Sequence, residues 1–508
     1  MKNIAGIIFL LIGLPVFFAT GQRSVMEVEM KGGRAQSVFS TTDVYSNIAY
    51  IFQGSKSIQI SILDASYKMT KEFLINRDET EKKNRIIGAT LSERNIVVYL
   101  FDHKERNFAS LVVDRFTGNH RFNPSIGALA KHEFLMESFE MEGVFYSMVV
   151  PQHKNAILLF ASNEGGDFAI RNYDVNFSAL YSKLSTKNDE LNKQPETPVG
   201  IERINYTIEN NIKSAYPSKK MYLSGNKIFM TFEEPSHTHV VIIDPYSPVA
   251  IYRKLNFSLD KGKNTTPSQG NSFLYKGNLF RISFSDDELN LIVINLDSMQ
   301  MLRSFNVFPD QPISFINGFV KEEGNDMQGK FIRVTSQYFK KLRQGKLAVA
   351  VNDLKDGYYE VELGAYEEVT VYRNSGMGGM GMGMGGMGMG MGMGGMGMGM
   401  GGIGIGMGSG MGMGGMGYGG YPGYYPNSGN QTTSIRVVYF QTLLRENDMS
   451  HVDGNVPVTM REKINDYEAE VLRNRSPDLL NVVPSHNGLL LGYYAKGHSR
   501  YNLVEFLK

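Results

Sequence analysis

The sequence predicts an all-β fold assembled from repeated antiparallel strands, and three observations support this prediction. Short apolar runs of strand length alternate with turns rich in Asn, Asp and Gly along most of the chain. A hairpin of one plan recurs about every 50 residues, which is the period of radial β arrays. The chain has no cysteine, so closure of the strands and burial of a core must stabilise the fold without disulfides.

The recurring hairpin starts at an Asn, and its first apolar strand ends near an aromatic residue. A polar turn and a second apolar strand follow, and an acidic residue ends the hairpin. The clearest copy runs from Asn226 through Phe232 to Asp244. An apolar segment precedes each hairpin and a semi-apolar segment follows it, so each unit contains four strands. The six copies span residues 47–64, 95–114, 155–174, 226–244, 278–297 and 487–505.

Four-stranded antiparallel units in tandem resemble the blades of a β-propeller. This resemblance is to the architecture, covers most of residues 35–508 and identifies no particular propeller family. It implies about seven blades, with six or eight as alternatives. One blade is degenerate, and its strands Val369–Tyr372 and Ile435–Phe440 are expected to pair across a long loop. The last hairpin is expected to close the ring by pairing with residues near Val25–Met30, which would remove exposed sheet edges.

The chain divides into four segments. Residues 1–21 are predicted to be a signal peptide, because Lys2 precedes an apolar run and small residues. Blades follow at 22–374, a Gly/Met/Tyr-rich low-complexity loop at 375–434, and the last propeller strands at 435–508. The apolar run is short for a membrane span, which needs about 20 residues. We therefore expect an exported protein, periplasmic or secreted, and its lack of disulfides favours a bacterium.

A short helical insert is predicted at about 459–474. Thr459-Met-Arg-Glu462 has the pattern of a capping box, in which the first and fourth residues satisfy each other's backbone N–H groups. One face of this helix is apolar, so it is expected to cover an apolar patch of the ring. That face comprises Met460, Ile464, Tyr467, Val471 and Leu472.

The low-complexity loop holds 15 of the 29 methionines. Because glycine alternates with methionine, ordering the segment is costly in entropy, and we expect a disordered loop. Three interpretations stay open: a spacer or tether, a cohesive segment, and a site for a soft cation such as Cu(I) or Ag(I). The ligands in the last case would be Met380, Met382, Met384, Met387, Met389, Met391, Met393, Met396, Met398 and Met400.

Two further groups of residues could form sites on the hairpin tips. His237 and His239 are spaced so that both imidazoles of an extended strand could reach one metal ion, although two ligands are too few. If the tips gather on one face, their acidic residues form an arc that could hold Ca²⁺ or a basic partner. The residues of this predicted binding face are Asp102, His103, Glu164, Asp167, Glu233, Glu234, Asp286, Asp287 and Glu288.

Charge and motifs narrow the function. Lys and Arg number 52 against 51 acidic residues, so no net field favours nucleic acid or an anionic membrane. The nucleophile elbow, the phosphate-binding loops and the His-Glu-x-x-His motif are missing from the sequence. The favoured hypothesis is a non-catalytic binding or scaffold protein whose partner is a protein or a glycan. Soft-metal binding by the methionines is the first alternative, and a hydrolase or lyase with carboxylates hidden in a central channel is the second.

Overall fold

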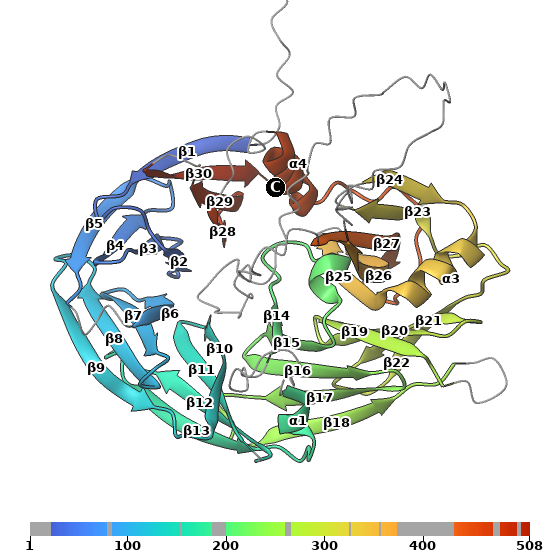
Figure 1. The fold of residues 1–508 in the computed structure, drawn as a ribbon, viewed down its shortest axis with the longest axis horizontal. Coiled ribbons are helices and arrows are strands. Elements are labelled where there is room, and N and C mark those ends of the chain that lie inside the picture. The colour runs from blue at the N-terminus through green and yellow to red at the C-terminus, as the bar shows by residue number, and fades with distance from the viewer. Residues whose placement is uncertain are drawn as a thin grey trace, which may run out of the picture.

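A computed structural model describes residues 22–78, 84–152, 154–184, 200–259, 266–324, 327–354, 357–372, 431–470, 478–494 and 499–507. Their strands form seven sheets arranged radially around one axis, so the protein is a seven-bladed β-propeller (Figure 1). The predicted fold class and the favoured blade number are confirmed. The signal segment and the Gly/Met-rich loop lie outside the described residues.

Four blades, numbers 1, 2, 3 and 5, consist of four strands that follow one another from the axis outward. Blade 1 contains β2 (Ser37–Thr42), β3 (Ile48–Gln53), β4 (Ser57–Leu63) and β5 (Met69–Asn76). Blade 2 contains β6 (Arg85–Leu91), β7 (Asn95–Asp102), β8 (Asn107–Asp114) and β9 (His120–Ala128). Blade 5 contains β19 (Gln269–Tyr275), β20 (Asn278–Phe284), β21 (Leu289–Asn295) and β22 (Met301–Val307).

Blade 3 shows that one hairpin assignment was wrong. Its strands are β10 (Glu133–Met141), β11 (Val144–Pro151), β12 (Ala156–Ser162) and β13 (Phe168–Asp174). The hairpin from Asn155 to Asp174 therefore joins the third and fourth strands, whereas the other five copies join the second and third. The residues of a turn indicate that two strands are adjacent, but they do not indicate which strands of the sheet these are. The spacing in the sequence therefore could not show that this hairpin joins the third and fourth strands.

Blade 4 carries an insertion that lies on the inner side of the ring. After β13, the chain forms α1 (Leu180–Leu184), β14 (Glu202–Ile204) and α2 (Ile212–Ala215). Strand β14 runs parallel to β15 (Lys219–Ser224), the first strand of the regular blade, and α2 packs on blade 6. The blade continues with β16 (Lys227–Glu234), β17 (His237–Ile243) and β18 (Ala250–Asn256). Residues 200–218, the axial insertion, thus line the centre of the ring.

Blade 6 is the degenerate blade. From the axis outward it contains β25 (Lys346–Leu354), β26 (Tyr358–Tyr372), β27 (Gln431–Arg445), β23 (Asn317–Gly324) and β24 (Met327–Ile332), with α3 (Thr335–Gln344) inserted before β25. Strands β26 and β27 pair antiparallel over their whole length, with Val369 opposite Ser434. The predicted pairing across the low-complexity loop is confirmed.

Blade 7 closes the ring as expected. It contains β28 (Asp478–Pro484), β29 (Gly488–Tyr494), β30 (Arg500–Leu507) and, as its outermost strand, β1 (Gln22–Glu29). The insert α4 (Met460–Glu470) packs on this blade through Met460, Ile464 and Tyr467. Its capping box is confirmed, because Thr459 N donates to Glu462 Oε2 at 2.8 Å and Glu462 N donates to Thr459 Oγ1 at 3.2 Å. The end of the predicted helix, 471–474, lies outside the described residues.

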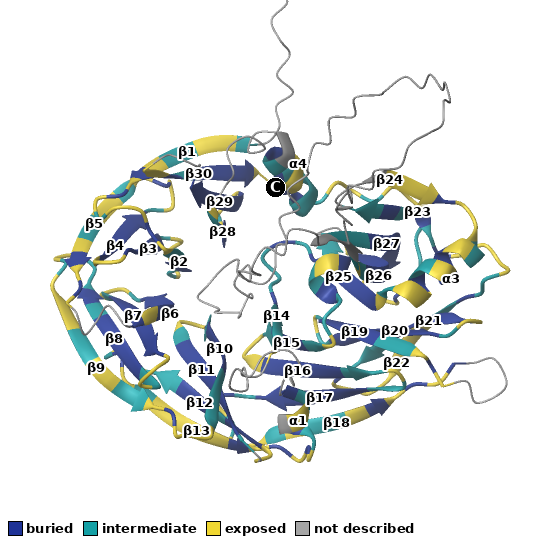
Figure 2. Ribbon diagram, viewed as in Figure 1, coloured by how far each residue is buried: buried dark blue, intermediate teal, exposed yellow. Residues whose placement is uncertain are grey.

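Apolar side chains pack between neighbouring blades, and the middle strands of each sheet are almost wholly buried (Figure 2). The first residues of β15, β19 and β25 surround one pocket, so the inner strands run in the same direction. Their starting ends share a face with the turns between second and third strands. We call this the tip face, and it carries the turns at Gly54, Lys104, Pro235 and Asp286.

Candidate functional site

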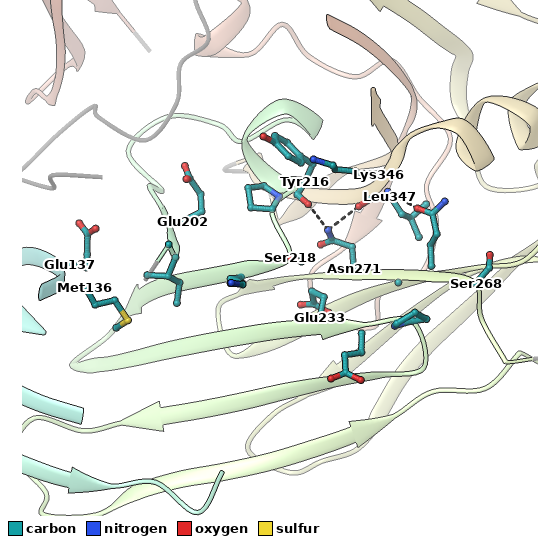
Figure 3. A pocket seen from close by; sticks show the side chains of 18 residues that line it. Met136, Glu137, Glu202, Tyr216, Ser218, Glu233, Ser268, Asn271, Lys346 and Leu347 are labelled. Atoms are coloured by element: carbon teal, nitrogen blue, oxygen red, sulfur yellow. Dashed lines mark hydrogen bonds between the residues drawn. The ribbon is translucent and has the colours of Figure 1, made fainter. Parts of the chain in front are cut away.

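A pocket of about 630 Å³ opens beside the axis on the tip face, which is the best candidate for a binding site (Figure 3). Its walls come from four blades: β10, the axial insertion and the β16–β17 turn, the start of β19, and the start of β25. Because β15, β19 and β25 contribute their first residues and β10 contributes Met136 and Glu137, backbone groups and side chains converge there. The charged residues of the wall are Glu137, Glu202, Lys219, Glu233, Glu234 and Lys346.

Asn271 ties three of these elements together at the pocket wall. Its Nδ2 donates to the carbonyls of Tyr216 (3.0 Å) and Leu347 (2.8 Å), as the dashed lines of Figure 3 show. Its Oδ1 accepts a hydrogen bond from Lys220 Nζ at 2.6 Å. Lys220 is fully buried, and this burial lowers the pKa of its ammonium group to about 8. The axial insertion, blade 5 and blade 6 are therefore held in one arrangement.

A buried ion pair fixes the β16–β17 turn. Arg281 projects from β20 of blade 5, and its Nη1 lies 2.5 Å from Glu233 Oε2. Its Nη2 donates to the carbonyls of Glu234 (2.7 Å) and Pro235 (2.8 Å). Burying such a pair is costly unless its other polar groups are bonded, and here the turn supplies both bonds of Nη2. Gly270 leaves room for the guanidinium, because a Cβ there would lie 1.8 Å from Arg281 Nη2.

Glu137 forms the blade 3 side of the pocket and is almost completely buried, with 2% of its surface exposed. Burial raises the pKa of its carboxyl group to about 7, and the Arg203 guanidinium 3.7 Å away opposes this shift. Across the pocket, burial lowers the pKa of Lys219. The pocket thus presents both carboxylates and ammonium groups.

The predicted histidine pair acquires a third possible ligand in the folded structure. Glu234 Oε2 lies 2.7 Å from His237 Nε2, and Glu234 Oε1 lies 3.4 Å from His239 Nε2. The other nitrogen of each ring is also bonded, His237 Nδ1 to Ser236 Oγ (3.2 Å) and His239 Nδ1 to Tyr252 Oη (2.8 Å). Burial lowers the pKa of both imidazoles.

The acidic residues of the predicted binding face do not form an open arc. Glu233 bonds Arg281, Glu234 bonds Lys183, and Asp286 bonds Arg343 at 2.7 Å. Asp102 accepts the backbone N–H groups of residues 104 and 105, as a turn former does, and Glu288 is buried. Most of these carboxylates are therefore engaged within the protein itself.

The remaining predicted residues are distributed differently. Glu164 and Asp167 lie on the turn between the third and fourth strands of blade 3, so they belong to the face opposite the tips. His103 and Asp287 lie on the tips of blades 2 and 5. The ten methionines of the proposed soft-metal site lie outside the described residues. The strand residues on either side of their loop, Tyr372 and Gln431, are paired at the tip-face end of blade 6.

A second, smaller cavity of about 190 Å³ lies between α2, α4 and blade 6. Glu362 lines it, and Glu360 lies on the same strand two residues away. Burial raises the pKa of Glu360 to about 7 and that of Glu362 well above its usual range. Gln441 Nε2 donates to Glu360 Oε1 at 2.6 Å, and the Ile212 amide donates to Glu362 Oε2 at 3.2 Å. Glu360 and Glu362 are thus two buried carboxylates on one strand, and only Glu362 lines the cavity.

Sequence reasoning missed Glu137, Glu202, Lys219, Asn271 and Lys346 as pocket residues. No local sequence motif marks these positions. The axial insertion is indicated in the sequence only by the longer interval between the third and fourth hairpins. The third residue of the histidine cluster, Glu234, could have been predicted from the sequence. Glu234 and His237 flank a two-residue turn and lie opposite each other in the hairpin.

The sheet topology and the axial pocket define the class of protein, a seven-bladed β-propeller with a polar pocket on its tip face. No family model matches the chain, and no curated protein matches its sequence. In the described residues, no helix is long and apolar enough to cross a membrane.

Solved structures that align with the chain include a streptogramin B lyase, at 8% identity over 95% of this chain and 97% of that one, with a TM-score of 0.29. The Dos1 propeller aligns at 11% identity over 67% and 83%, with a TM-score of 0.27. The dihydro-heme d1 dehydrogenase NirN aligns at 8% identity over 54% of this chain, which spans 48% of that one, with a TM-score of 0.27. We transfer no activity from these alignments.

Proposed function

We propose that this protein is an exported, non-catalytic β-propeller that binds a segment of another protein in the axial pocket. The observation that carries this proposal is the convergence of four blades on one polar cavity of about 630 Å³. Cavities of this size with a few convergent polar groups are the usual ligand sites of proteins. The bonds of Asn271 and Arg281 hold the walls in place before binding, which lowers the entropic cost of association.

The composition of the pocket favours a peptide over a glycan. Sugar rings are commonly bound on an open aromatic face, and among the described residues of the pocket wall the one aromatic side chain is Tyr216. Its ring stacks on Tyr366 with centroids 4.0 Å apart, and the Lys346 ammonium lies 5.3 Å from its centroid. A peptide instead presents donors, acceptors and charges of both signs, which match Glu202, Lys219 and Lys346.

Photo-crosslinking tests the proposal. A photoreactive residue at Ser218, which is exposed in the pocket wall, is expected to crosslink one host protein in native extracts. The control position is Ser298, an exposed turn residue between β21 and β22 on the face opposite the tips. The proposal fails if Ser218 yields no protein adduct, if both positions yield the same adducts, or if the adduct is a glycan.

The export part of the proposal is supported by residues 1–21 and by the position of β1. The described residues of this strand, Gln22–Glu29, all follow the expected cleavage position, so the mature chain would retain its closing strand. N-terminal sequencing of the protein from its host is expected to start at or near Gln22. A chain that starts at Met1 would contradict cleavage.

Soft-metal binding by the loop at 375–434 remains a second proposal, motivated by the ten closely spaced thioethers. Deleting residues 376–420 is expected to abolish Cu(I) uptake by the purified protein. Unchanged uptake would contradict this role and leave the loop as a tether or cohesive segment. The enzyme alternative has less support, because Glu360 and Glu362 are bonded within the protein and their cavity is below the usual size of ligand sites.

A further inference from the structure

Glu234, His237 and His239 form a compact group at the base of the β16–β17 turn. Their ligand atoms all lie within 4.8 Å of one another, and the two rings project from the same side of β17 because they are two residues apart. His239 exposes 7% of its side chain and His237 exposes 15%. The group is therefore held by the fold and is not a loose collection of surface side chains.

We propose that these three residues bind a Zn²⁺ ion, with His237 Nε2, His239 Nε2 and one carboxylate oxygen of Glu234 as ligands. Two imidazoles and one carboxylate make a ligand set that suits Zn²⁺, whereas Ca²⁺ prefers oxygen ligands alone. Three protein ligands leave a fourth position of the tetrahedral ion for water or for a group from a bound molecule.

The surroundings of the three residues support a metal site independently. Zinc-binding histidines usually bond their second nitrogen to a neighbouring group, which fixes the direction of the first. Here Tyr252 Oη and Ser236 Oγ bond the two Nδ1 atoms, and both Nε2 atoms are left facing Glu234. The Phe177 ring stacks on His239 with centroids 4.5 Å apart and restrains that imidazole further.

Lys183 determines how Glu234 would coordinate the ion. Its ammonium group bonds Glu234 Oε1, so Oε2, which faces His237, is the oxygen available to the metal. Ligand atoms around a tetrahedral zinc ion lie about 3.4 Å apart, given bonds of about 2.0–2.2 Å. Small side-chain rotations would bring the three atoms from their present separations to that distance. Because Glu234 also lines the axial pocket, the ion would lie at the pocket rim.

Zinc titration of the purified full-length chain tests the inference. After treatment with a chelator, calorimetric titration with ZnCl₂ is expected to show one site. His237→Gln and Glu234→Gln keep the size of each side chain but remove a ligand, so each is expected to weaken the affinity at least about 100-fold. The matched control is His120→Gln, because His120 is exposed on β9 and far from the cluster.

Two further measurements test whether the zinc binds elsewhere and whether the variants are still folded. The same titration on a chain that lacks residues 376–420 is expected to give the same affinity, which excludes the methionine loop as the zinc site. Circular dichroism melts without metal should match for all variants, and Zn²⁺ should raise the melting temperature of wild type and His120→Gln only. The inference is overturned if wild type does not bind Zn²⁺ with a dissociation constant of about 10⁻⁴ M or lower. It is also overturned if the cluster variants bind Zn²⁺ as tightly as wild type does.

Discussion

Arg281 illustrates how single residues hold the tip face together. Its guanidinium is fully buried, yet it bonds a carboxylate, a hydroxyl group and two backbone carbonyls of the neighbouring blade. Two blades that share no strand are thereby joined by one side chain. Several acidic residues of the predicted binding face are engaged in such bonds within the protein. The pocket beside the axis is therefore a better candidate site than the acidic residues of the turns.

Gly270→Ala tests the close approach between blades 4 and 5. The new methyl group would overlap Arg281 Nη2 and lie 2.8 Å from the Pro235 carbonyl, so the guanidinium must shift. We expect a loss of about 1–3 kcal/mol in the free energy of unfolding, measured by urea denaturation. Gly329→Ala on β24 is the control, because its nearest neighbours lie 3.9 Å away. Equal stability of both variants would contradict the steric argument.

Glu137 predicts a dependence of stability on pH. Its pKa is raised to about 7 in the folded state, so between pH 4.5 and pH 7 the folded protein binds more protons than the unfolded chain. This contribution to stability is complete below pH 4.5 and is lost as the pH rises through 7. Glu137→Gln removes this pH dependence, since the amide stays neutral.

The expected result for Glu137→Gln is a gain relative to wild type that grows with pH. At pH 4 the two proteins should have nearly equal free energies of unfolding, and at pH 8 the variant should be more stable by up to about 3 kcal/mol. Urea denaturation at both values measures this difference. A difference that does not change with pH would show that Glu137 is ionised in the folded protein.

The elements of the ring differ in how they depend on their neighbours. Each regular hairpin forms from adjacent residues, whereas the axial insertion acquires its place from blades 3, 5 and 6. Helix α4 depends both on local residues and on distant ones. Its start is fixed by its own capping box, and its position is fixed by packing on blade 7.

Thr459→Ala tests the local part of that stability. The variant loses the hydroxyl that accepts the Glu462 amide, which should destabilise the first turn of α4 by about 1 kcal/mol. Amide hydrogen exchange in this turn is expected to become about fivefold faster, while exchange in blade 2 stays unchanged. Thr459→Ser retains a hydroxyl and should exchange like wild type. Unaltered exchange in the alanine variant would contradict a role for the cap.

At the scale of the whole molecule, the ring depends on a contact between its two ends. Strand β1 pairs with β30, and Val28 is completely buried among residues of blades 1 and 7. Closure covers the edge that β30 would otherwise expose.

Val28→Ala tests the strength of this closure. Removing two buried methyl groups is expected to lower the free energy of unfolding by about 2 kcal/mol. Val44→Ala is the control, because Val44 is 89% exposed, and it should change stability by less than about 0.5 kcal/mol. Urea denaturation of both variants checks the prediction. A ring that tolerates Val28→Ala as well as the control would be held closed by other contacts.

The sequence by itself determined the architecture. Alternating apolar residues, Asn- and Asp-rich turns and a fixed interval are properties of neighbouring residues, and they were enough to predict seven blades and the closing strand. The capping box of α4 was equally local, since its two members are three residues apart. The turns and the capping box agree with the fold because each depends on residues close together in the chain.

Only the tertiary structure decided the site. In the structure, the third hairpin lies one strand further from the axis than the other hairpins, and residues 200–218 lie along the axis. Glu233 is buried against Arg281, which lies 48 positions away in the sequence. The fold also places Lys183 beside Glu234, 51 positions away. The physical reason is that burial, ion pairing and the shape of a pocket arise from contacts between residues far apart in the chain, and no local pattern records which of those contacts will form.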